Sequence, residues 1–343
     1  MHKRNQLLEY AVKEGATDIH ICAGSSVLFR IGRKLRSVTE EKLTPQMSKD
    51  LSYEFLTDEQ RIAFEEQLDY DLMLTCNGAR FRINVGYFNG SVGTIVRVLS
   101  DEPMSLEEIG LPDVVKSLAK RQKGLVLITG STSQGKTTTM AAMIDNINKT
   151  SRKHIVTIED PIEYVHRNKN SIVRQREVGT DTQSFCSGLR AALRQDPDVI
   201  AIGEMRDYET IKIALTASET GILVLSTLHV ISIDKIIERL ISYAPDDGEN
   251  RLRFLLAEAL QGVIHQELLP LKKGGQQVAP EIMVTTNAAK NIIRRKGGYH
   301  LQTVMSTGKK FGMCTMTESV TDLLDKKLIT EDVAKSVLIN YST

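Results

Sequence analysis

Residues 130–137 contain the feature that most constrains this chain, because they read Gly-Ser-Thr-Ser-Gln-Gly-Lys-Thr, the spacing G-x-x-x-x-G-K-[ST]. The two glycines let the backbone curl until its N–H groups point at phosphate oxygens. Lys136 then reaches the outer phosphates, and the Thr137 hydroxyl is a ligand for Mg²⁺. We therefore predict a phosphate-binding loop for a nucleoside triphosphate. Its contacts are expected from Gly130, Ser131, Thr132, Ser133, Gln134, Gly135, Lys136, Thr137 and Thr138.

The segments on either side of this loop favour the prediction over a glycine-rich surface turn. Residues 124–129 are apolar and read as a short buried strand. After the loop, apolar residues follow at i, i+3, i+4 and i+7, which is one face of a helix. These residues are Met140, Met143, Ile144 and Ile147. Strand, loop and helix in this order place the phosphates at a helix N-terminus.

Short apolar segments that end in polar residues recur through the second part of the chain. They cover 125–128, 155–158, 199–202 and 222–225. Nearly continuous apolar strands predict an α/β fold with a parallel sheet that is covered on both faces. Ligands of such sheets bind beyond the carboxyl ends of the strands, so we expect the polar strand ends to meet at one site.

Two of these strand ends carry candidate catalytic groups. Glu204 follows the third strand and is predicted to orient or deprotonate the attacking water. His229 follows the fourth strand, where it would contact the γ-phosphate or Glu204. The alternatives are a solvated carboxylate at 204 and a histidine of purely structural role at 229.

A third strand end carries several carboxylates, in Glu159-Asp160-Pro161-Ile162-Glu163. We predict that Asp160-Pro161 forms a turn and that Glu159 and Glu163 position Mg²⁺ and water at the γ-phosphate. The alternative is helix capping, because acidic residues beside proline often begin a helix.

The first hundred residues read as a separate small α/β domain. A helix is expected over 7–14 and strands over 18–22, 27–31, 80–85 and 93–99. The predicted organisation is therefore a first domain at 1–100, a linker at 101–112 and a nucleotide-binding domain at 113–343. A stripe of leucines after Pro245 predicts that the part from about residue 245 is helical.

Composition limits the other classes of function. A formal net charge of +1 gives no overall field to attract nucleic acid, so no nucleic-acid partner is expected. No apolar run approaches the length of a membrane span, and no apolar segment of a signal peptide follows the basic N-terminus. The four cysteines lie far apart, which is typical of reduced thiols in a cytosolic protein. They are Cys22, Cys76, Cys186 and Cys314.

Together the motifs resemble those of the type II/type IV secretion ATPases, and most of all the type IV pilus retraction (twitching motility) ATPases. The resemblance rests on the loop from 124, Thr-Ile-Glu-Asp-Pro-Ile-Glu-Tyr from 157, Leu-Arg-Ala-Ala-Leu-Arg-Gln-Asp-Pro-Asp-Val-Ile from 189, Gly-Glu-Met-Arg-Asp from 203 and Leu-Ser-Thr-Leu-His from 225. It covers nearly the whole chain and includes Gly15-Ala-Thr-Asp-Ile-His20.

The resemblance implies a homo-hexameric ring of RecA-like domains, each preceded by a PAS-like domain, that hydrolyses ATP with Mg²⁺. Such a motor would act from the cytoplasm at the inner face of the membrane, through an inner-membrane platform protein. The resemblance assigns Glu163 as the acidic-box glutamate, Glu204 as the catalytic glutamate and His229 as the histidine-box residue. It also implies that Arg82 and Arg97 of the first domain complete the nucleotide site.

The chain departs from the family pattern at three places, and several alternative functions stay open. Ile222 stands where relatives usually have a histidine, residues 287–293 match the family's C-terminal motif only loosely, and the phosphate-binding loop also differs. The loop has Ser131, Ser133 and Gln134 where relatives commonly have Pro, Gly and Ser, so position 133 must adopt a backbone conformation that serine tolerates. The alternative functions are a motor for pilus assembly, type II secretion or DNA uptake, and a weakly active nucleotide-binding subunit of a mixed ring. A RecA-like protein that tracks nucleic acid is disfavoured by the near-neutral charge.

Overall fold

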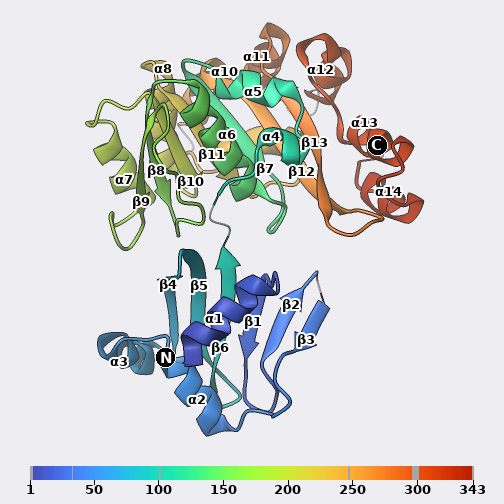
Figure 1. Cartoon of the computed structure of the whole chain (residues 1–343). Helices are drawn as coiled ribbons and strands as arrows, with labels where there is room; N and C mark the ends of the chain where they lie inside the picture. Colours follow the sequence, from blue (N-terminus) through green and yellow to red (C-terminus); the bar gives the residue numbers. More distant parts are fainter. Residues whose placement is uncertain (1–2, 33, 100–101, 246–247, 296–300, 342–343) are drawn as a thin grey trace. The chain divides into compact units, whose positions relative to one another are not determined.

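The computed structural model describes the chain except for residues 1–2, 33, 100–101, 246–247, 296–300 and 342–343. It divides into two compact units, residues 1–102 and 103–343 (Figure 1). Each unit combines helices with one sheet, which confirms the predicted α/β class. The predicted domain boundary falls on residues 100 and 101, which lie outside the described residues.

The first unit is an antiparallel sheet in the order β3-β2-β1-β6-β5-β4, with three helices. Its elements are α1 (Lys3–Lys13), β1 (Asp18–Ile21), β2 (Leu28–Ile31), β3 (Lys34–Ser37), α2 (Pro45–Tyr53), α3 (Asp58–Gln67), β4 (Asp69–Cys76), β5 (Ala79–Phe88) and β6 (Ser91–Leu99). The sequence patterns predict α1, β1, β2, β5 and β6 but not α2, α3, β3 or β4. Strand β3 is exposed along its whole length, and the residues of β4 are at most partly buried.

Alternation along these strands separates an apolar face from a charged face. Ile19, Phe29 and Val96 are opposite one another in the strand register, and all are fully buried. The neighbouring register row holds Arg30, Asp18 and then Arg97, because successive side chains of a strand point to opposite faces. The first unit therefore buries one face of its sheet and presents arginines on the other.

The second unit is a seven-stranded sheet in the order β13-β12-β7-β11-β10-β8-β9. Its strands are β7 (Gly124–Thr129), β8 (His154–Glu159), β9 (Ile172–Glu177), β10 (Val199–Glu204), β11 (Leu223–Leu228), β12 (Leu260–Pro270) and β13 (Gln276–Val284). All pairs are parallel except β12 with β13. The parallel sheet that the apolar segments predicted is confirmed.

Helices cover both faces of this sheet. They are α4 (Leu106–Ile109), α5 (Asp113–Ala119), α6 (Lys136–Thr150), α7 (Phe185–Ala192), α8 (Tyr208–Glu219), α9 (Ile233–Ile241), α10 (Glu249–Ala259), α11 (Asn287–Arg294), α12 (Leu301–Thr307), the short 3₁₀ helix η2 (Lys309–Phe311), α13 (Met316–Asp325) and α14 (Glu331–Leu338). Leu125 and Leu127 of β7 join one core with α7–α12, while Val126 and Ile128 join the other with α4–α6. The predicted face of α6 is buried in the second core, as the periodicity required.

The prediction of a helical part from about residue 245 is wrong for residues 260–284. The leucine stripe does form α10, but the chain then enters β12 beside β7 and returns as β13 (Figure 1). Leu260 fits the spacing of the helical stripe but is the first residue of β12, so the stripe shows no end at residue 259. The β-branched pair Val263 and Ile264, fully buried between neighbouring strands, is the signal for a strand that the helical reading passed over.

No helix in the described part of the chain is long and apolar enough to cross a membrane.

Helix α6 anchors the irregular segment 160–171 that follows β8. Asn148 accepts a hydrogen bond from the backbone N–H of Lys169 at 3.0 Å and donates one to the carbonyl of Arg167 at 2.7 Å. Asp145, nearly buried, pairs with Lys149 at 2.6 Å and with Lys169 at 2.5 Å. Burial alone would raise the pKa of Asp145, but hydrogen bonds from the two lysines outweigh it and lower the pKa.

Replacing Asp145 with alanine should destabilise the protein by about 2–3 kcal/mol, because it leaves two lysines without their buried partner. Lys149→Ala removes one exposed partner and should cost no more than about 1 kcal/mol. Because folding lowers the pKa of Asp145, its ionised carboxylate stabilises the folded protein. This stabilisation is complete above the unfolded-state pKa of about 4 and is lost as the pH falls below that value. Urea unfolding at pH 7 and pH 3 measures both effects. Equal losses in the two variants at pH 7 would contradict this account.

Candidate functional site

The predicted phosphate-binding loop connects β7 to α6 and has the backbone that its glycines require. Gly130 and Gly135 have φ of 148° and 79°. A Cβ at Gly130 would lie 2.7 Å from the carbonyl oxygen of Gln266, so no larger residue fits there. Gly135 is the N-cap of the fifteen-residue helix α6, whose first N–H groups have no partner within the helix. This end of α6 is suited to bind phosphate.

Lys136 holds a buried ammonium group inside the loop. Its Nζ donates to the carbonyls of Gly130 at 2.9 Å and Ser131 at 2.6 Å. Within the described residues no carboxylate lies at ion-pair distance from it. Burial lowers the pKa of Lys136 to about 8, against the opposing effect of Glu204. A buried cation with only neutral partners is stabilised by an incoming anion, so this environment fits a nucleotide phosphate.

The structure brings Lys136, His229 and Glu204 together at the carboxyl edge of the sheet. The Nδ1 atom of His229 lies 3.3 Å from the Lys136 Nζ, and its Nε2 lies 3.9 Å from a Glu204 oxygen. Burial, and next the charge of Lys136, lower the pKa of His229 and keep the ring neutral at neutral pH. Because Nδ1 then accepts from the ammonium, Nε2 carries the proton and faces the carboxylate. His229 is therefore placed to bridge the two groups.

Arg206 is a residue of this edge that the sequence analysis missed. It forms an ion pair with Glu204, and this hydrogen bond is the main reason that the pKa of Arg206 is raised. The guanidinium is largely exposed, with 67% of its side-chain surface accessible, so it can leave the carboxylate at little cost. Its position two residues after a candidate catalytic glutamate, within the Gly-Glu-Met-Arg-Asp string from 203, is a signal that could have found it.

The acidic segment after β8 divides into a buried and a partly exposed carboxylate. Glu159 is buried and accepts hydrogen bonds from Thr157 and, at 3.0 Å, from Gln175. Glu163 is half-buried, and the hydroxyl of the next residue, Tyr164, lies 3.0 Å from that of Thr138 in the first turn of α6. No helix occurs between Glu159 and β9 in this fully described stretch. The helix-capping alternative is therefore wrong.

Strand β12 is a second component of the site that the motifs did not predict. The side-chain amide of Gln266 donates to the carbonyl of Gln134 at 2.6 Å. In return, the side-chain carbonyl of Gln134 accepts from the backbone N–H of Leu268 at 2.5 Å. The loop is thus held, through the backbone and the side chain of Gln134, by a strand more than 130 residues away in sequence.

Arg82 and Arg97 lie opposite each other on β5 and β6 of the first unit. The sequence shows no neighbouring residue of opposite charge, but the sheet supplies one for each arginine. Arg97 pairs with Asp18 at 3.1 Å and Arg82 with Asp71 at 3.8 Å. The side chains remain 61% and 39% exposed, so both guanidinium groups are accessible to a ligand. Their part in catalysis stays a prediction.

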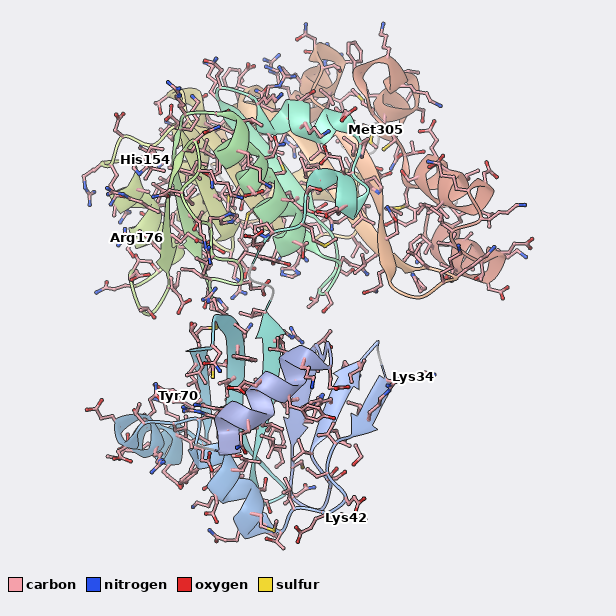
Figure 2. The ribbon with its side chains drawn as sticks, viewed as in Figure 1. Lys34, Lys42, Tyr70, His154, Arg176 and Met305 are labelled. Atoms are coloured by element: carbon pink, nitrogen blue, oxygen red, sulfur yellow. The ribbon has the colours of Figure 1, made fainter. Side chains whose placement is uncertain are left out.

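Figure 2 shows the side chains of the described residues on the ribbon. His154 lies at the start of β8 and Arg176 near the end of the parallel strand β9, so the two lie toward opposite ends of this strand pair. Arg176 donates to the carbonyl of Asp181 at 2.7 Å, so it orders the turn that leads to α7. The edge strand β9 thereby positions Gln175, the partner of the buried Glu159.

The loop contains one strained residue. Ser133 has φ of 63°, the left-handed conformation that glycine adopts freely and other residues do not. An L-residue in this region costs roughly 1–2 kcal/mol, and the Ser133 hydroxyl makes no hydrogen bond within the described residues.

Replacing Ser133 with glycine should leave the stability unchanged or raise it by up to about 1 kcal/mol, because the relief of strain exceeds the added entropy of the unfolded chain. Ser133→Val should lower the stability by more than about 1 kcal/mol, since a β-branched residue is poorly accommodated at positive φ. Urea unfolding without nucleotide measures both. A clear loss of stability in Ser133→Gly would mean that the hydroxyl has a role that the loop geometry does not show.

Comparison with known proteins places this site in a family. A family model described as type II/IV secretion system protein matches residues 2–336. The type IV pilus retraction ATPase PilT of Pseudomonas aeruginosa is 41% identical over 331 residues, 96% of each chain. A twitching motility protein of Neisseria gonorrhoeae is 38% identical, over 90% of this chain and 83% of that protein.

The fold agrees with these matches. The crystal structure of the pilus retraction motor PilT with bound ADP is similar with a TM-score of 0.87 and 42% identity, covering 96% of this chain and 95% of that one. The likeness includes both units, the N-terminal domain and the RecA-like domain that carries the phosphate-binding loop. The chain therefore belongs to the type II/IV secretion ATPase family.

Proposed function

We propose that this chain is an ATP-hydrolysing motor that works as a homo-hexamer and powers the retraction of type IV pili. The observation that carries the proposal is the 41% identity to a retraction ATPase over almost the full length of both chains. The site supports it, because Lys136, Glu204 and His229 meet at one edge of the sheet. The motor would act in the cytoplasm at the inner membrane, on a platform protein of the pilus machine.

Nucleotide binding would use the loop and the start of α6. Lys136 would exchange its two carbonyl partners for phosphate oxygens, and the free N–H groups of residues 130–138 would hold the rest of the phosphate chain. The Thr137 hydroxyl, half-buried in the first turn of α6, would be a ligand for Mg²⁺. The metal would neutralise part of the phosphate charge.

Hydrolysis would depend on Glu204 and His229. The Glu204 carboxylate would orient a water whose oxygen attacks the γ-phosphorus while the bond to the ADP oxygen breaks. His229 would connect this carboxylate to Lys136 and so report whether a γ-phosphate is present. Glu163, on the segment held against α6, and the buried Glu159 would position Mg²⁺ and its waters.

The coupling to mechanical work would come from the first domain. Arg82 and Arg97 would approach the γ-phosphate when a ring of subunits closes around ATP. Guanidinium groups there would neutralise the charge that spreads over the phosphoryl oxygens as the β–γ bond breaks. Release of phosphate would then free the domain to move against the RecA-like domain.

The second candidate is a motor for pilus assembly, secretion or DNA uptake, and the description of the family model, type II/IV secretion system protein, supports the secretion alternative. A weakly active accessory subunit is less favoured, because the three central groups of the site are complete. Deletion of the gene and counting of surface pili tests the direction. Excess pili are expected for a retraction motor, whereas loss of pili would support assembly and contradict our proposal.

The roles of Lys136 and Glu204 should separate in variants. Lys136→Ala should weaken nucleotide binding and abolish turnover, because the ammonium contacts phosphate before the reaction. Glu204→Gln should still bind nucleotide but hydrolyse ATP on the order of 10²–10⁴-fold more slowly. Binding of a fluorescent ADP analogue and phosphate release measure the two properties. Glu219→Gln, at the exposed end of α8, is the control, and normal turnover in Glu204→Gln would disprove the assignment.

Arg82→Ala and Arg97→Ala should bind nucleotide and form rings normally but hydrolyse ATP roughly 10³–10⁵-fold more slowly. Lysine should substitute poorly at either position, since it lacks the planar fork. Arg36→Ala, at an exposed site on β3 of the same sheet, is the control and should retain full turnover. The measurements are turnover per subunit, oligomer mass and nucleotide affinity. If both variants turn over like the parent, the first domain does not complete the active site.

A further inference from the structure

A chain of hydrogen bonds connects the end of β7 to the C-terminal end of the protein. Thr129, the fully buried residue before Gly130, lies opposite His265 in the parallel pairing of β7 and β12. Its hydroxyl is 3.1 Å from the Nδ1 atom of His265. The other ring nitrogen, Nε2, is 2.8 Å from the hydroxyl of Tyr341, which donates to Glu267 at 3.0 Å.

The Glu267 carboxylate, which can only accept, fixes the donor and the acceptor in each of these hydrogen bonds. Tyr341 has one hydroxyl proton and gives it to the Glu267 carboxylate, so it must accept from Nε2–H of His265. Burial, and next the charge of Lys136, lower the pKa of His265 to about 4, which keeps the ring neutral. Its Nδ1 is then free to accept the hydroxyl proton of Thr129. Hydrogen bonds aligned in this way strengthen one another in a buried environment.

Tyr341 is held in place by a small core of its own. Helices α13 and α14 pack on the β12–β13 hairpin through buried residues from both, and Tyr341 is half-buried against this cluster (Figure 1). The fully or nearly buried members are Leu269, Ala279, Met316, Val320, Ile329 and Ala334. The position of the Tyr341 hydroxyl therefore depends on how α13 and α14 sit on the sheet.

The same stretch of β12 also touches the loop directly. Gln266 contacts the carbonyl of Gln134 through its side chain, and its own carbonyl lies against Gly130. A displacement of His265 would thus move Gln266 and shift both ends of residues 130–134. His265 therefore lies next to the residue of β12 that holds the loop.

We propose that Tyr341 is a positioning residue for the phosphate-binding loop, acting through His265 on Thr129, so that α13 and α14 control the affinity for nucleotide. The proposal deepens the proposed function and rests on nucleotide binding at that loop. It makes the C-terminal helices a place where a bound partner would alter the active site without touching it.

The first test removes one oxygen. Tyr341→Phe should increase amide hydrogen exchange of residues 130–135 in the nucleotide-free protein, and should weaken binding of a fluorescent ADP analogue about three- to tenfold, the effect of one lost buried hydrogen bond. Tyr208→Phe is the control, because the Tyr208 hydroxyl has no hydrogen-bond partner within the described residues and belongs to the same unit. Unchanged loop exchange in Tyr341→Phe would overturn the proposal, even if α14 itself exchanged faster.

The second test asks whether Thr129 and Tyr341, at the two ends of the series of hydrogen bonds, act together on nucleotide binding. Thr129→Val removes the hydroxyl and keeps the shape, so it should weaken ADP binding as much as Tyr341→Phe, and the double variant should be no weaker than either. Thr129→Ser keeps the donor and should bind like the parent. Additive losses would mean that Tyr341 acts by packing alone and would overturn the proposal. A parent protein that binds ADP but hydrolyses no ATP would contradict only the proposed function.

Discussion

The second unit is organised around a buried ammonium group that has no carboxylate beside it. Lys136 is only 7% exposed, and carbonyls of its own loop are the groups that hold it in place. Gly130 and Gly135 have positive φ, which lets the loop curl around the ammonium group. Burying the Lys136 charge without a carboxylate costs free energy that a bound anion would offset. The loop, the start of α6 and the neighbouring strand ends together form the site for that anion.

The parallel sheet explains why the other polar groups gather there. Both faces of its strands are buried under helices, so polar side chains are accommodated chiefly where the strands end. Three of these groups lie at the ends of separate strands. Glu159 ends β8, Glu204 ends β10, and His229 directly follows β11. The parallel pairing of the strands brings them to one edge of the sheet. Such an edge is where ligands of open α/β sheets bind.

This regularity is also what made much of the site predictable. The loop, Glu204 and His229 follow from spacing and from the order of apolar segments, because each depends on local sequence and on one rule about strand ends. His265 and Tyr341 could not be found in this way. They lie 136 and 212 residues from Thr129, and their contacts exist only once β12 has entered the sheet beside β7. Nothing in the local pattern of residues 260–270 marks a histidine that faces a phosphate-binding loop.

In the first unit, two charged residues lie where they do not favour the stability of the sheet. Two arginines directly opposite on adjacent strands repel each other, which makes the Arg82–Arg97 pair unfavourable for the stability of the sheet. Asp18 offsets this only in part, since it is shared with Arg30 at 3.3 Å, and the Asp71 pair is long. A surface built for stability alone would alternate the charges. Two exposed guanidinium groups side by side are instead suited to bind an anion with several oxygens.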